Sequence, residues 1–253
     1  CSPAGQSQLK ITPDLVAGVL KFGGGESRYT YTGSMSGWSS TAISICIAGS
    51  IGHRWGRVAT ASPDGALILF DNRVGTAGLA LQIGNGSAGS DSNLLYLEYY
   101  SGGSLIEQAT SIRLPDSGKY ALFVTLSGTS LTATLIAADG AVTTDTKTLA
   151  STPAGYALAP AIYCATSGTW AGVYGDIGAA AVYDSALTAN QMRQWHATYG
   201  VRYGLPAWSG SASALPAGNV ALLDPQGSLA SWPEPSKAPA SYVLDGKELT
   251  AAG

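Results

Sequence analysis

The sequence predicts an all-β protein, built as an antiparallel sandwich of two sheets with one short helix and an extended C-terminal arm. Many short segments alternate apolar and polar residues with a period of two, as half-buried strands do. Tight turns separate these segments, and 33 of the 253 residues are glycine. A helix signature occurs between residues 187 and 200, and no strand–helix–strand rhythm accompanies it, so a parallel sheet is not expected.

The predicted strands begin after a polar N-terminal arm at residues 1–12 and belong to one domain, predicted to span residues 13–204. Asp139-Gly140 lies between two alternating segments and is the strongest hairpin signal in the chain. We expect strands at residues 15–22, 40–49, 56–62, 66–72, 78–84, 93–101, 104–110, 119–127, 130–138, 141–149, 159–166 and 175–184.

The helix is predicted at residues 189–199, and both of its ends carry sequence signals. Thr188 and Gln191 can form a capping box, in which each side chain bonds the backbone N–H of the other residue. Gly200 is expected to end the helix in the left-handed conformation. Leu187, before the cap, is expected to pack against the first residue of an apolar stripe that faces the sandwich. This stripe consists of Met192, Trp195 and Tyr199.

Residues 205–253 differ in composition and predict an extended arm. Six of the 12 prolines lie there, and the apolar segments are too short to fold alone. Trp208 and Trp232 argue against a disordered linker, and we expect them to anchor the arm on its own domain or on a neighbouring subunit. A flexible tail is the alternative. If the arm bridges subunits, deleting it should abolish assembly and leave a folded monomer.

The charge pattern limits the classes of partner. Charged residues make up 11% of the chain, the net charge is −3, and the 13 lysines and arginines form no cluster, so nucleic acid is not an expected partner. No apolar run approaches the roughly 20 residues that a transmembrane helix needs. The low charge suits a surface buried in an assembly, although an ordinary β-protein of low charge explains it equally well.

The three cysteines show no metal-binding spacing. Cys46 and Cys164 lie in predicted strands, where buried free thiols are favoured over a disulfide, and the sequence leaves their pairing open. Cys1 precedes a polar stretch and resembles the lipidated first residue of a mature bacterial lipoprotein. Removal of a preceding methionine is the alternative.

The segment VYDSALTANQMRQWHATYGVRYG, residues 182–204, joins a strand, a capped helix and a closing Tyr-Gly. It resembles the closing segment of the concanavalin A-like lectin/glucanase superfamily in its laminin G-like form. The resemblance covers roughly residues 10–204. It implies a two-sheet antiparallel jelly roll whose helix covers an end or an open face of the sandwich. It implies less about function, because this fold includes lectins, hydrolases, adhesion modules and phage structural proteins.

The chain carries no residue set that predicts catalysis. Retaining glucanases of this superfamily share an E-x-D-x-x-E strand motif that supplies two carboxylates about 5 Å apart, and none of the five glutamates here begins one. Glu98 lies alone among aromatic residues and is expected to point outward from its strand. His196 lies off the apolar stripe and is expected in solvent on the helix. We therefore expect a protein that is not an enzyme.

The resemblance also suggests two kinds of binding site. Laminin G-like domains often bind calcium at a rim of the sandwich through oxygen ligands, and Ca²⁺ is the one cofactor to consider. The metal candidates are Asp71, Asn72, Asp91 and Asn93, although all four are also ordinary turn residues. Sugar binding needs aromatic platforms near loops, although most such residues pack in a core. The sugar candidates are Trp38, Trp55, Trp170 and Tyr174.

The leading interpretation is a non-catalytic structural protein of a bacteriophage virion, either a capsid decoration or a tail-associated protein. Its expected partners are other virion or assembly proteins in an oligomeric arrangement, with surface glycans as a further ligand. The alternative is a carbohydrate-binding lectin or adhesin, secreted or on a bacterial surface and anchored through Cys1. The phage setting rests on the resemblance to phage proteins with the same closing segment.

Overall fold

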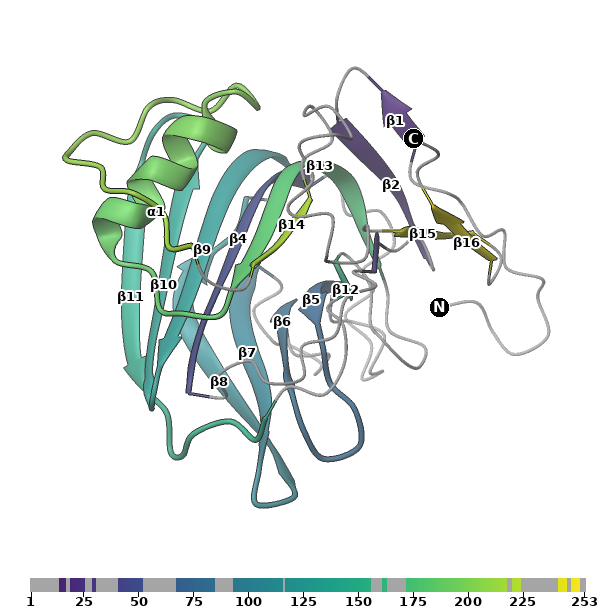
Figure 1. The fold of residues 1–253 in the computed structure, drawn as a ribbon, viewed down its shortest axis with the longest axis vertical. Helices are drawn as coiled ribbons and strands as arrows, with labels where there is room; N and C mark the ends of the chain where they lie inside the picture. The colour runs from purple at the N-terminus through teal and green to yellow at the C-terminus, as the bar shows by residue number, and fades with distance from the viewer. Residues whose placement is uncertain are drawn as a thin grey trace.

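A computed structural model shows two antiparallel sheets packed face to face and one short helix, which confirms the predicted all-β sandwich (Figure 1). The structure describes residues 14–16, 19–25, 29–30, 41–51, 67–84, 93–115, 117–155, 161–162, 172–217, 220–223, 241–244 and 247–250. The predicted N-terminal arm and the predicted strand at 56–62 lie outside these residues.

Sheet A has the strand order β1-β2-β13-β4-β9-β10-β11, and β14 pairs with β13 off this path. All of its pairings are antiparallel. Its strands are β1 (Asp14–Val16), β2 (Val19–Gly25), β4 (Ala42–Ile51), β9 (Gly118–Ser127), β10 (Ser130–Ala137), β11 (Val142–Thr148), β13 (Gly172–Tyr183) and β14 (Val220–Leu223).

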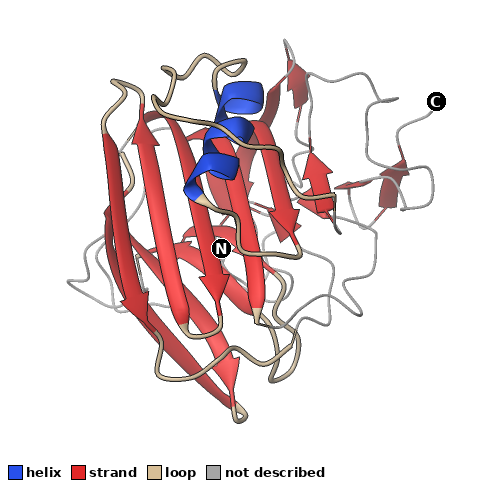
Figure 2. Ribbon diagram, turned by 60° about the vertical axis from the view of Figure 1, so that its left-hand side comes forward, coloured by secondary structure: helices blue, strands red, loops and turns tan. Residues whose placement is uncertain are grey.

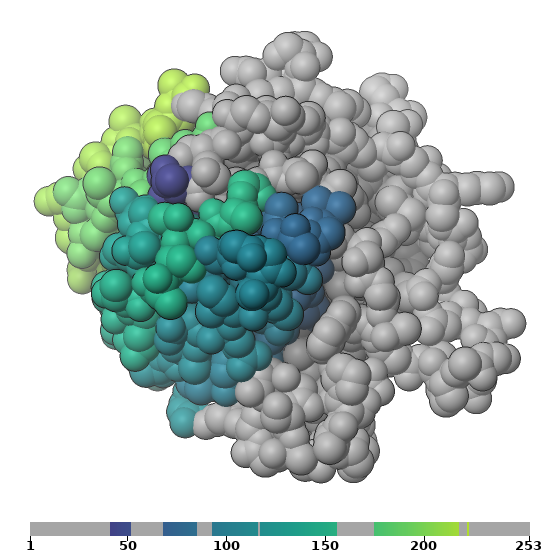
Figure 3. Space-filling view, turned by 90° about the horizontal axis from the view of Figure 1, so that it is seen from below, coloured from purple at the N-terminus to yellow at the C-terminus, as the bar shows by residue number. Residues whose placement is uncertain are grey.

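Sheet B has the order β16-β15-β3-β12-β5-β6-β7-β8 and is also antiparallel. Its strands are β3 (Tyr29–Thr30), β5 (Leu67–Asp71), β6 (Leu79–Ile83), β7 (Leu94–Ser101), β8 (Ser104–Arg113), β12 (Ala161–Ile162), β15 (Ser241–Leu244) and β16 (Lys247–Thr250). In a view from below, the teal residues of β7 to β11 adjoin the yellow-green residues that follow β13 (Figure 3).

The main core lies between the two sheets and follows the period-two alternation of the strands. On β4, Ile43, Ile45 and Ile47 point into it and are buried. Each such side chain stabilises the fold by about 1.5–3 kcal/mol relative to exposure. The residues between them face the other way, and Cys46 among them is a buried free thiol. This agrees with the expectation for Cys46, while Cys164 lies outside the described residues.

A second apolar cluster lies on the outer face of sheet A, the face turned away from sheet B. Small and aromatic side chains of the sheet, such as Ala48 and Phe123, meet a helix that crosses this face (Figure 2). The helix α1 (Ala189–Trp195) continues as a π-helical turn, His196–Gly200. Trp195 is fully buried and its ring meets the ring of Phe123 edge-on, with 5.5 Å between centroids. The helix therefore covers an open face of the sandwich, as predicted.

The start of the helix confirms the predicted capping box. The Gln191 backbone N–H donates to Thr188 Oγ1 at 3.3 Å, and the Thr188 backbone N–H donates to Gln191 Oε1 at 2.9 Å. Leu187 and Met192 are both buried in the cluster on the outer face of sheet A. The two residues of the predicted hydrophobic staple therefore lie in the same apolar cluster.

The end of the helix differs from the prediction at Gly200. This residue is not left-handed, because the helical conformation continues to Val201, with φ −64°, and the chain reverses at Gly204, with φ +92°. Gly200 is needed for a different reason. A Cβ atom there would lie 2.3 Å from His196 Nδ1, so only glycine lets the backbone pass so close to the imidazole ring.

His196 is the second correction, because it is fully buried rather than in solvent. Its Nε2 lies 2.7 Å from the Pro206 carbonyl oxygen, and its ring packs edge-on against the rings of Phe123 and Trp208. The segment after the helix folds back over this side of the helix and removes it from water. Helical periodicity alone could not predict that cover.

Residues 205–217 run over the helix and the outer face of sheet A. Leu205 is buried there, and Trp208 packs beside Phe123 with 5.7 Å between ring centroids. The Arg193 guanidinium lies over the Trp208 ring and donates from Nε to the Ser209 carbonyl. The described start of the predicted arm therefore packs on its own domain, and β14 then pairs with β13. Trp232 lies outside the described residues.

No helix in the described part of the chain is both long enough and apolar enough to cross a membrane.

Candidate functional site

A row of carboxylates crosses the outer face of sheet B, the face turned away from sheet A. Asp71 at the end of β5 pairs with Ala80 on β6. Ala80 pairs in turn with Glu98 on β7, and Glu98 pairs with Glu107 on β8. Residues opposite one another in antiparallel strands point to the same face. Ala80 carries only a methyl group, which leaves room for a longer side chain above it.

Strand alternation explains why these polar side chains share a face. Leu81 and Leu97 belong to the core between the sheets, so Gln82 and Glu98, the residues that follow them, point to the outer face of sheet B. A register shift within β5, just before its last residues, brings Asp71 into the row. Such bulges re-aim side chains locally. The row therefore follows from register rather than from a sequence motif.

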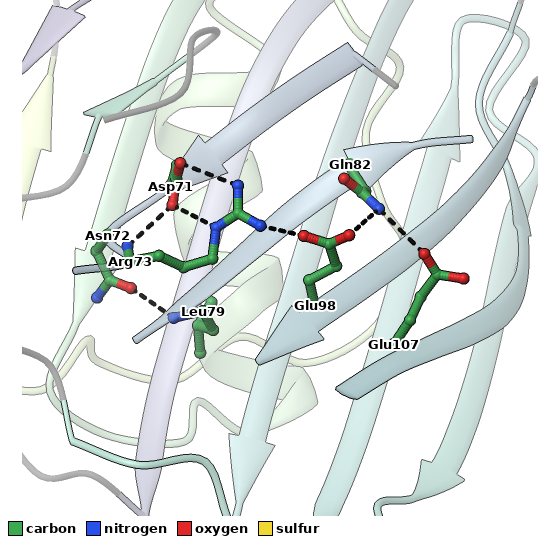
Figure 4. A network of polar contacts seen from close by, with 7 residues as sticks. All are labelled: Asp71, Asn72, Arg73, Leu79, Gln82, Glu98 and Glu107. Atoms are coloured by element: carbon green, nitrogen blue, oxygen red, sulfur yellow. Dashed lines mark hydrogen bonds and ion pairs between the residues drawn. The ribbon is translucent and has the colours of Figure 1, made fainter. Parts of the chain in front are cut away.

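Arg73, in the turn after β5, bridges the row across β6 (Figure 4). Its Nε lies 3.0 Å from Asp71 Oδ1 and its Nη2 lies 3.2 Å from Asp71 Oδ2, so the pair is bidentate. Its Nη1 donates to Glu98 Oε2. Burial alone would lower the pKa of this guanidinium, but Asp71 and Glu98 together raise it above its usual value. Arg73 is therefore a fixed cation between two carboxylates.

Gln82 extends the network towards the edge of the sheet. Its Nε2 donates to Glu98 Oε1 at 2.8 Å and lies 3.4 Å from Glu107 Oε2 (Figure 4). Gln82 is 0% exposed and Glu98 is 6% exposed, whereas Glu107 is exposed. Gln82 Oε1 is buried and accepts no hydrogen bond from any described residue. The network, defined by Asp71, Arg73, Gln82, Glu98 and Glu107, thus runs from buried to solvent-exposed groups.

The structure corrects the expectation that Glu98 stands alone. It does point away from the core, but it is buried and paired with Arg73 and Gln82. A sequence signal existed: Gln82 in LALQI and Glu98 in LLYLEYY are each a polar residue inside an apolar strand. A buried strand tolerates such a residue only where another polar group meets it. Arg73 and Glu107 gave no comparable signal.

The chemistry of this network favours hydrogen bonding over acid–base catalysis. Glu98 and Glu107 share one amide nitrogen, which fits the spacing of about 5 Å between the carboxylates of retaining glycosidases. However, Arg73 engages Oε2 of Glu98 and Gln82 engages Oε1. These two contacts hold Glu98 in one orientation, and its side chain is buried, so a substrate has little access to it. The array instead presents fixed acceptors for hydroxyl donors.

Three of the four predicted metal ligands lie in the described part of the chain. Asp71 is bound by Arg73, and Asn72 Oδ1 accepts from the Leu79 backbone N–H at 2.8 Å. Asn93 directly precedes β7, about 17 Å along the chain from Glu98 at the strand rise of about 3.3 Å per residue. No described group of three or more His, Cys, Asp or Glu side chains could hold a metal ion. Calcium binding by these residues stays a prediction.

The predicted sugar-binding residues give no site that can be described. Trp38, Trp55 and Trp170 lie outside the described residues, as does the metal candidate Asp91. The backbone of Tyr174 pairs with Gly23 between β13 and β2. The aromatic platform hypothesis thus stays a prediction.

Comparison with known proteins gives a fold and no sequence family. No protein-family profile matches the sequence, and no curated protein matches it. The enzymatically active domain of bacteriophage CBA120 tailspike protein 2 superposes with a TM-score of 0.50 at 11% identity, over 73% of this chain and 28% of that one. The chain thus spans less than a third of that tailspike domain.

Two further structures resemble the chain at lower TM-scores. A SAP-like pentraxin from Limulus polyphemus gives 0.48 at 11% identity, over 83% of this chain and 95% of that one. Domains LG4-5 of the mouse laminin α1 chain give 0.46 at 13% identity, over 72% and 46%. Identities this low bear on the fold alone. The fold is a two-sheet antiparallel sandwich, the architecture that the resemblance of the closing segment implied.

Proposed function

We propose that this chain is a non-catalytic structural module of a bacteriophage virion, a capsid decoration or tail-associated protein. Its lectin-like sandwich makes protein–protein contacts and binds a surface glycan. The fold likeness to the CBA120 tailspike domain supports the phage setting. That domain is described as enzymatically active, so the non-catalytic assignment rests on the chemistry of the candidate site.

The observation that carries the assignment is the state of Glu98. Its two oxygens are occupied by Arg73 and Gln82, and Arg73 is itself held by a bidentate contact with Asp71. Breaking a buried charge pair costs several kcal/mol, about 3–5 in other proteins. Glu98 is therefore buried and held by two neighbours, which supports a structural role for it at the site rather than attack on a substrate.

The same network supports a glycan as the ligand. Glu107 offers an exposed carboxylate beside Gln82, at the solvent-exposed end of the network. Sugar hydroxyls are donors, and hydrogen bonds to a charged acceptor are stronger than those to a neutral one. Because Arg73 balances part of the negative charge, the site suits neutral hydroxyl groups better than a free metal cation.

Sedimentation of the protein from its native source tests the virion assignment first. Co-sedimentation with large particles that resist detergent is the expected result. Release from membranes by detergent would contradict it and favour the alternative of a lectin or adhesin on a bacterial surface. A protein that sediments slowly and freely would contradict both settings.

Binding to an array of bacterial surface glycans tests the site. Glu107→Gln keeps an acceptor beside Gln82 but removes the charge, and should weaken glycan binding by about tenfold or more. Asp139→Asn is the matched control, because Asp139 lies in the turn between β10 and β11 of sheet A and its Oδ1 accepts from Ala141. Equal binding by both variants would contradict a glycan site on sheet B.

A further inference from the structure

Strand β11 forms the edge of sheet A and offers unpaired backbone groups along its length. It pairs with β10 alone, in one unbroken register from Ser130↔Thr148 to Ile136↔Val142. At its two ends, the Ala137 N–H donates to the Ala141 carbonyl and the Leu149 N–H donates to the Thr129 carbonyl. Hydrogen-bonded and non-hydrogen-bonded pairs alternate in an antiparallel ladder. Odd-numbered residues of β11 therefore bond to β10.

The even-numbered residues of β11 direct their N–H and C=O groups outward. These residues are Val142, Thr144, Thr146 and Thr148, and all four are exposed. None of their outward backbone groups is bonded within the described part of the chain. The strand has no proline and no bulge, two of the devices that protect an edge, and its two charges, Asp145 and Lys147, restrict which strand can be added. It is a template for an added antiparallel strand.

The side chains of β11 are sorted by face. Thr144 and Thr146 contact Thr134 and Thr132 of β10 through their hydroxyl groups, at 3.0 and 3.3 Å. Asp145 and Lys147 point to the opposite face, at register positions level with core residues of β10. One face thus carries hydroxyl groups and the other carries one acid and one base, two residues apart.

Asp145 is held in place by a contact between the two sheets. Its Oδ2 accepts from the Ser111 backbone N–H of β8 at 2.7 Å, and Lys147 Nζ lies 3.5 Å from the same oxygen. The Asp145 side chain is 13% exposed and the Lys147 side chain is 38% exposed. The carboxylate is therefore fixed, while the ammonium group can reach a partner beyond the edge.

We propose that β11 is a homodimer interface, in which it pairs antiparallel with β11 of a second copy about a two-fold axis at Thr146. In this register Thr144 lies opposite Thr148 of the second copy, and Thr146 lies opposite Thr146 of the second copy. The outward N–H and C=O groups of the two strands therefore face one another and can form hydrogen bonds. Asp145 then lies opposite Lys147 of the second copy, and the reverse pair repeats by symmetry. The two A sheets join into one.

The charges of Asp145 and Lys147 favour a second copy of the chain as the partner and determine the register of the pairing. A two-fold axis one residue earlier would place Asp145 opposite Asp145 of the second copy, and like charges directly opposite destabilise a strand pair. Asp145 and Lys147 already lie 3.5 Å apart within one chain, and a second copy in this register repeats the same opposite-charge pair twice across the interface. An unrelated strand gains that match only if its own charges have the same spacing. The acid and base add little affinity on a surface, so they fix the register while backbone hydrogen bonds hold the pair.

Sedimentation velocity of the full chain over a concentration series tests this interface. The parent protein should be dimeric. Lys147→Asp places acids opposite acids at two positions and should raise the dimer dissociation constant by about tenfold or more, an effect that high salt reduces. Lys147→Gln is the matched control and should weaken the dimer less. The exchange D145K/K147D restores opposite charges and should recover dimerisation relative to K147D.

Two further results decide the proposal. Thr146→Pro removes an outward N–H at the axis and the hydroxyl contact with Thr132, but no backbone hydrogen bond to β10, so it should give a folded monomer by near-ultraviolet circular dichroism. A dimer that survives this change, or a parent chain that is monomeric throughout, overturns the proposal. A folded D145K/K147D that is no more dimeric than K147D also overturns it. These results concern the isolated chain and leave virion attachment to its own test.

Discussion

At the scale of single residues, Arg73 is the residue on which the candidate site depends most. It is the one cation of the network and touches two buried carboxylates. Arg73→Met keeps much of the side-chain volume and removes the cation that both Asp71 and Glu98 contact. We expect the free energy of unfolding to fall by about 3–5 kcal/mol, measured by urea denaturation.

The double variant R73M/E98Q separates charge from packing. It removes the uncompensated carboxylate together with the arginine and should recover part of the lost stability. If R73M were as stable as the parent, or if the double variant were no better than R73M, the network would not be held by charge pairing. Either result would also weaken the argument that Glu98 is locked.

His196 gives a prediction for pH. Burial lowers its pKa below the usual value, against the smaller opposing effect of the bond to Pro206. A carbonyl accepts, so Nε2 carries the proton, and Nδ1 is buried without a described partner. Protonation at Nδ1 would place a charged donor there. The folded state binds this proton less readily than the unfolded state, so stability is fully present above pH of about 6.5 and falls as pH decreases below it.

The measurement is the melting temperature of the parent and of His196→Gln between pH 8 and pH 5. Glutamine can still donate to the Pro206 carbonyl, but it does not titrate. The parent should lose more stability than the variant over this interval. Parallel curves would show that His196 contributes nothing to the pH dependence.

At the scale of elements, the helix depends on its N-terminal cap. The Thr188 side chain accepts from the Gln191 backbone N–H, and the Gln191 side chain accepts from the Thr188 backbone N–H. Thr188→Ala removes the first of these two hydrogen bonds. We expect a loss of about 1 kcal/mol in the free energy of unfolding. Thr198→Ala is the matched control, because Thr198 donates to the Gln194 carbonyl on an exposed part of the helix and caps nothing. Similar losses in both variants would contradict a capping role.

The elements also show which features can be predicted from sequence. The long strands from β4 to β11 and the capping box follow from local alternation and local hydrogen bonds, so they were predicted with nearly correct bounds, whereas β3, β14, β15 and β16 were not predicted. The strand predicted at 56–62 lies outside the described residues. The burial of His196 and the pairing of Glu98 depend on other segments of the chain. The segment that contains Pro206 covers His196, and the Arg73 guanidinium binds Glu98. Local periodicity places a side chain on a face and contains nothing about what later covers that face.

The carboxylate row shows the same limit on a larger scale. It joins Asp71 to Glu107 across four strands, through the register of three hairpin pairings and one bulge. No spacing along the sequence encodes a cross-strand row, since each register depends on the turns and on the core. The paired carboxylates of the superfamily motif lie along one strand instead, which is why a motif search could not find this arrangement.

At the scale of the whole molecule, residues 205–217 pack on the domain. Leu205 and Trp208 pack into the cluster on the outer face of sheet A. The Ser213 backbone N–H donates to the Asn190 carbonyl, and the Gln191 side chain donates to the Ala214 carbonyl. Deleting residues 205–253 should therefore expose buried aromatic rings and lower the free energy of unfolding by more than about 3 kcal/mol. The sequence alone had suggested a folded monomer.

Two chain lengths test this last point and separate folding from assembly. A chain that ends at Leu223 keeps the packed segment and β14 and loses only β15 and β16 at the end of sheet B, so it should keep most of the stability that the cluster on the outer face of sheet A provides. A chain that ends at Gly204 should unfold much earlier and bind a hydrophobic dye, because Trp195 and Phe123 lose their cover. If both truncated chains were equally stable, residues 205–217 would be a detachable arm after all. If only the longer one folds yet fails to attach to particles, attachment depends on residues 224–253.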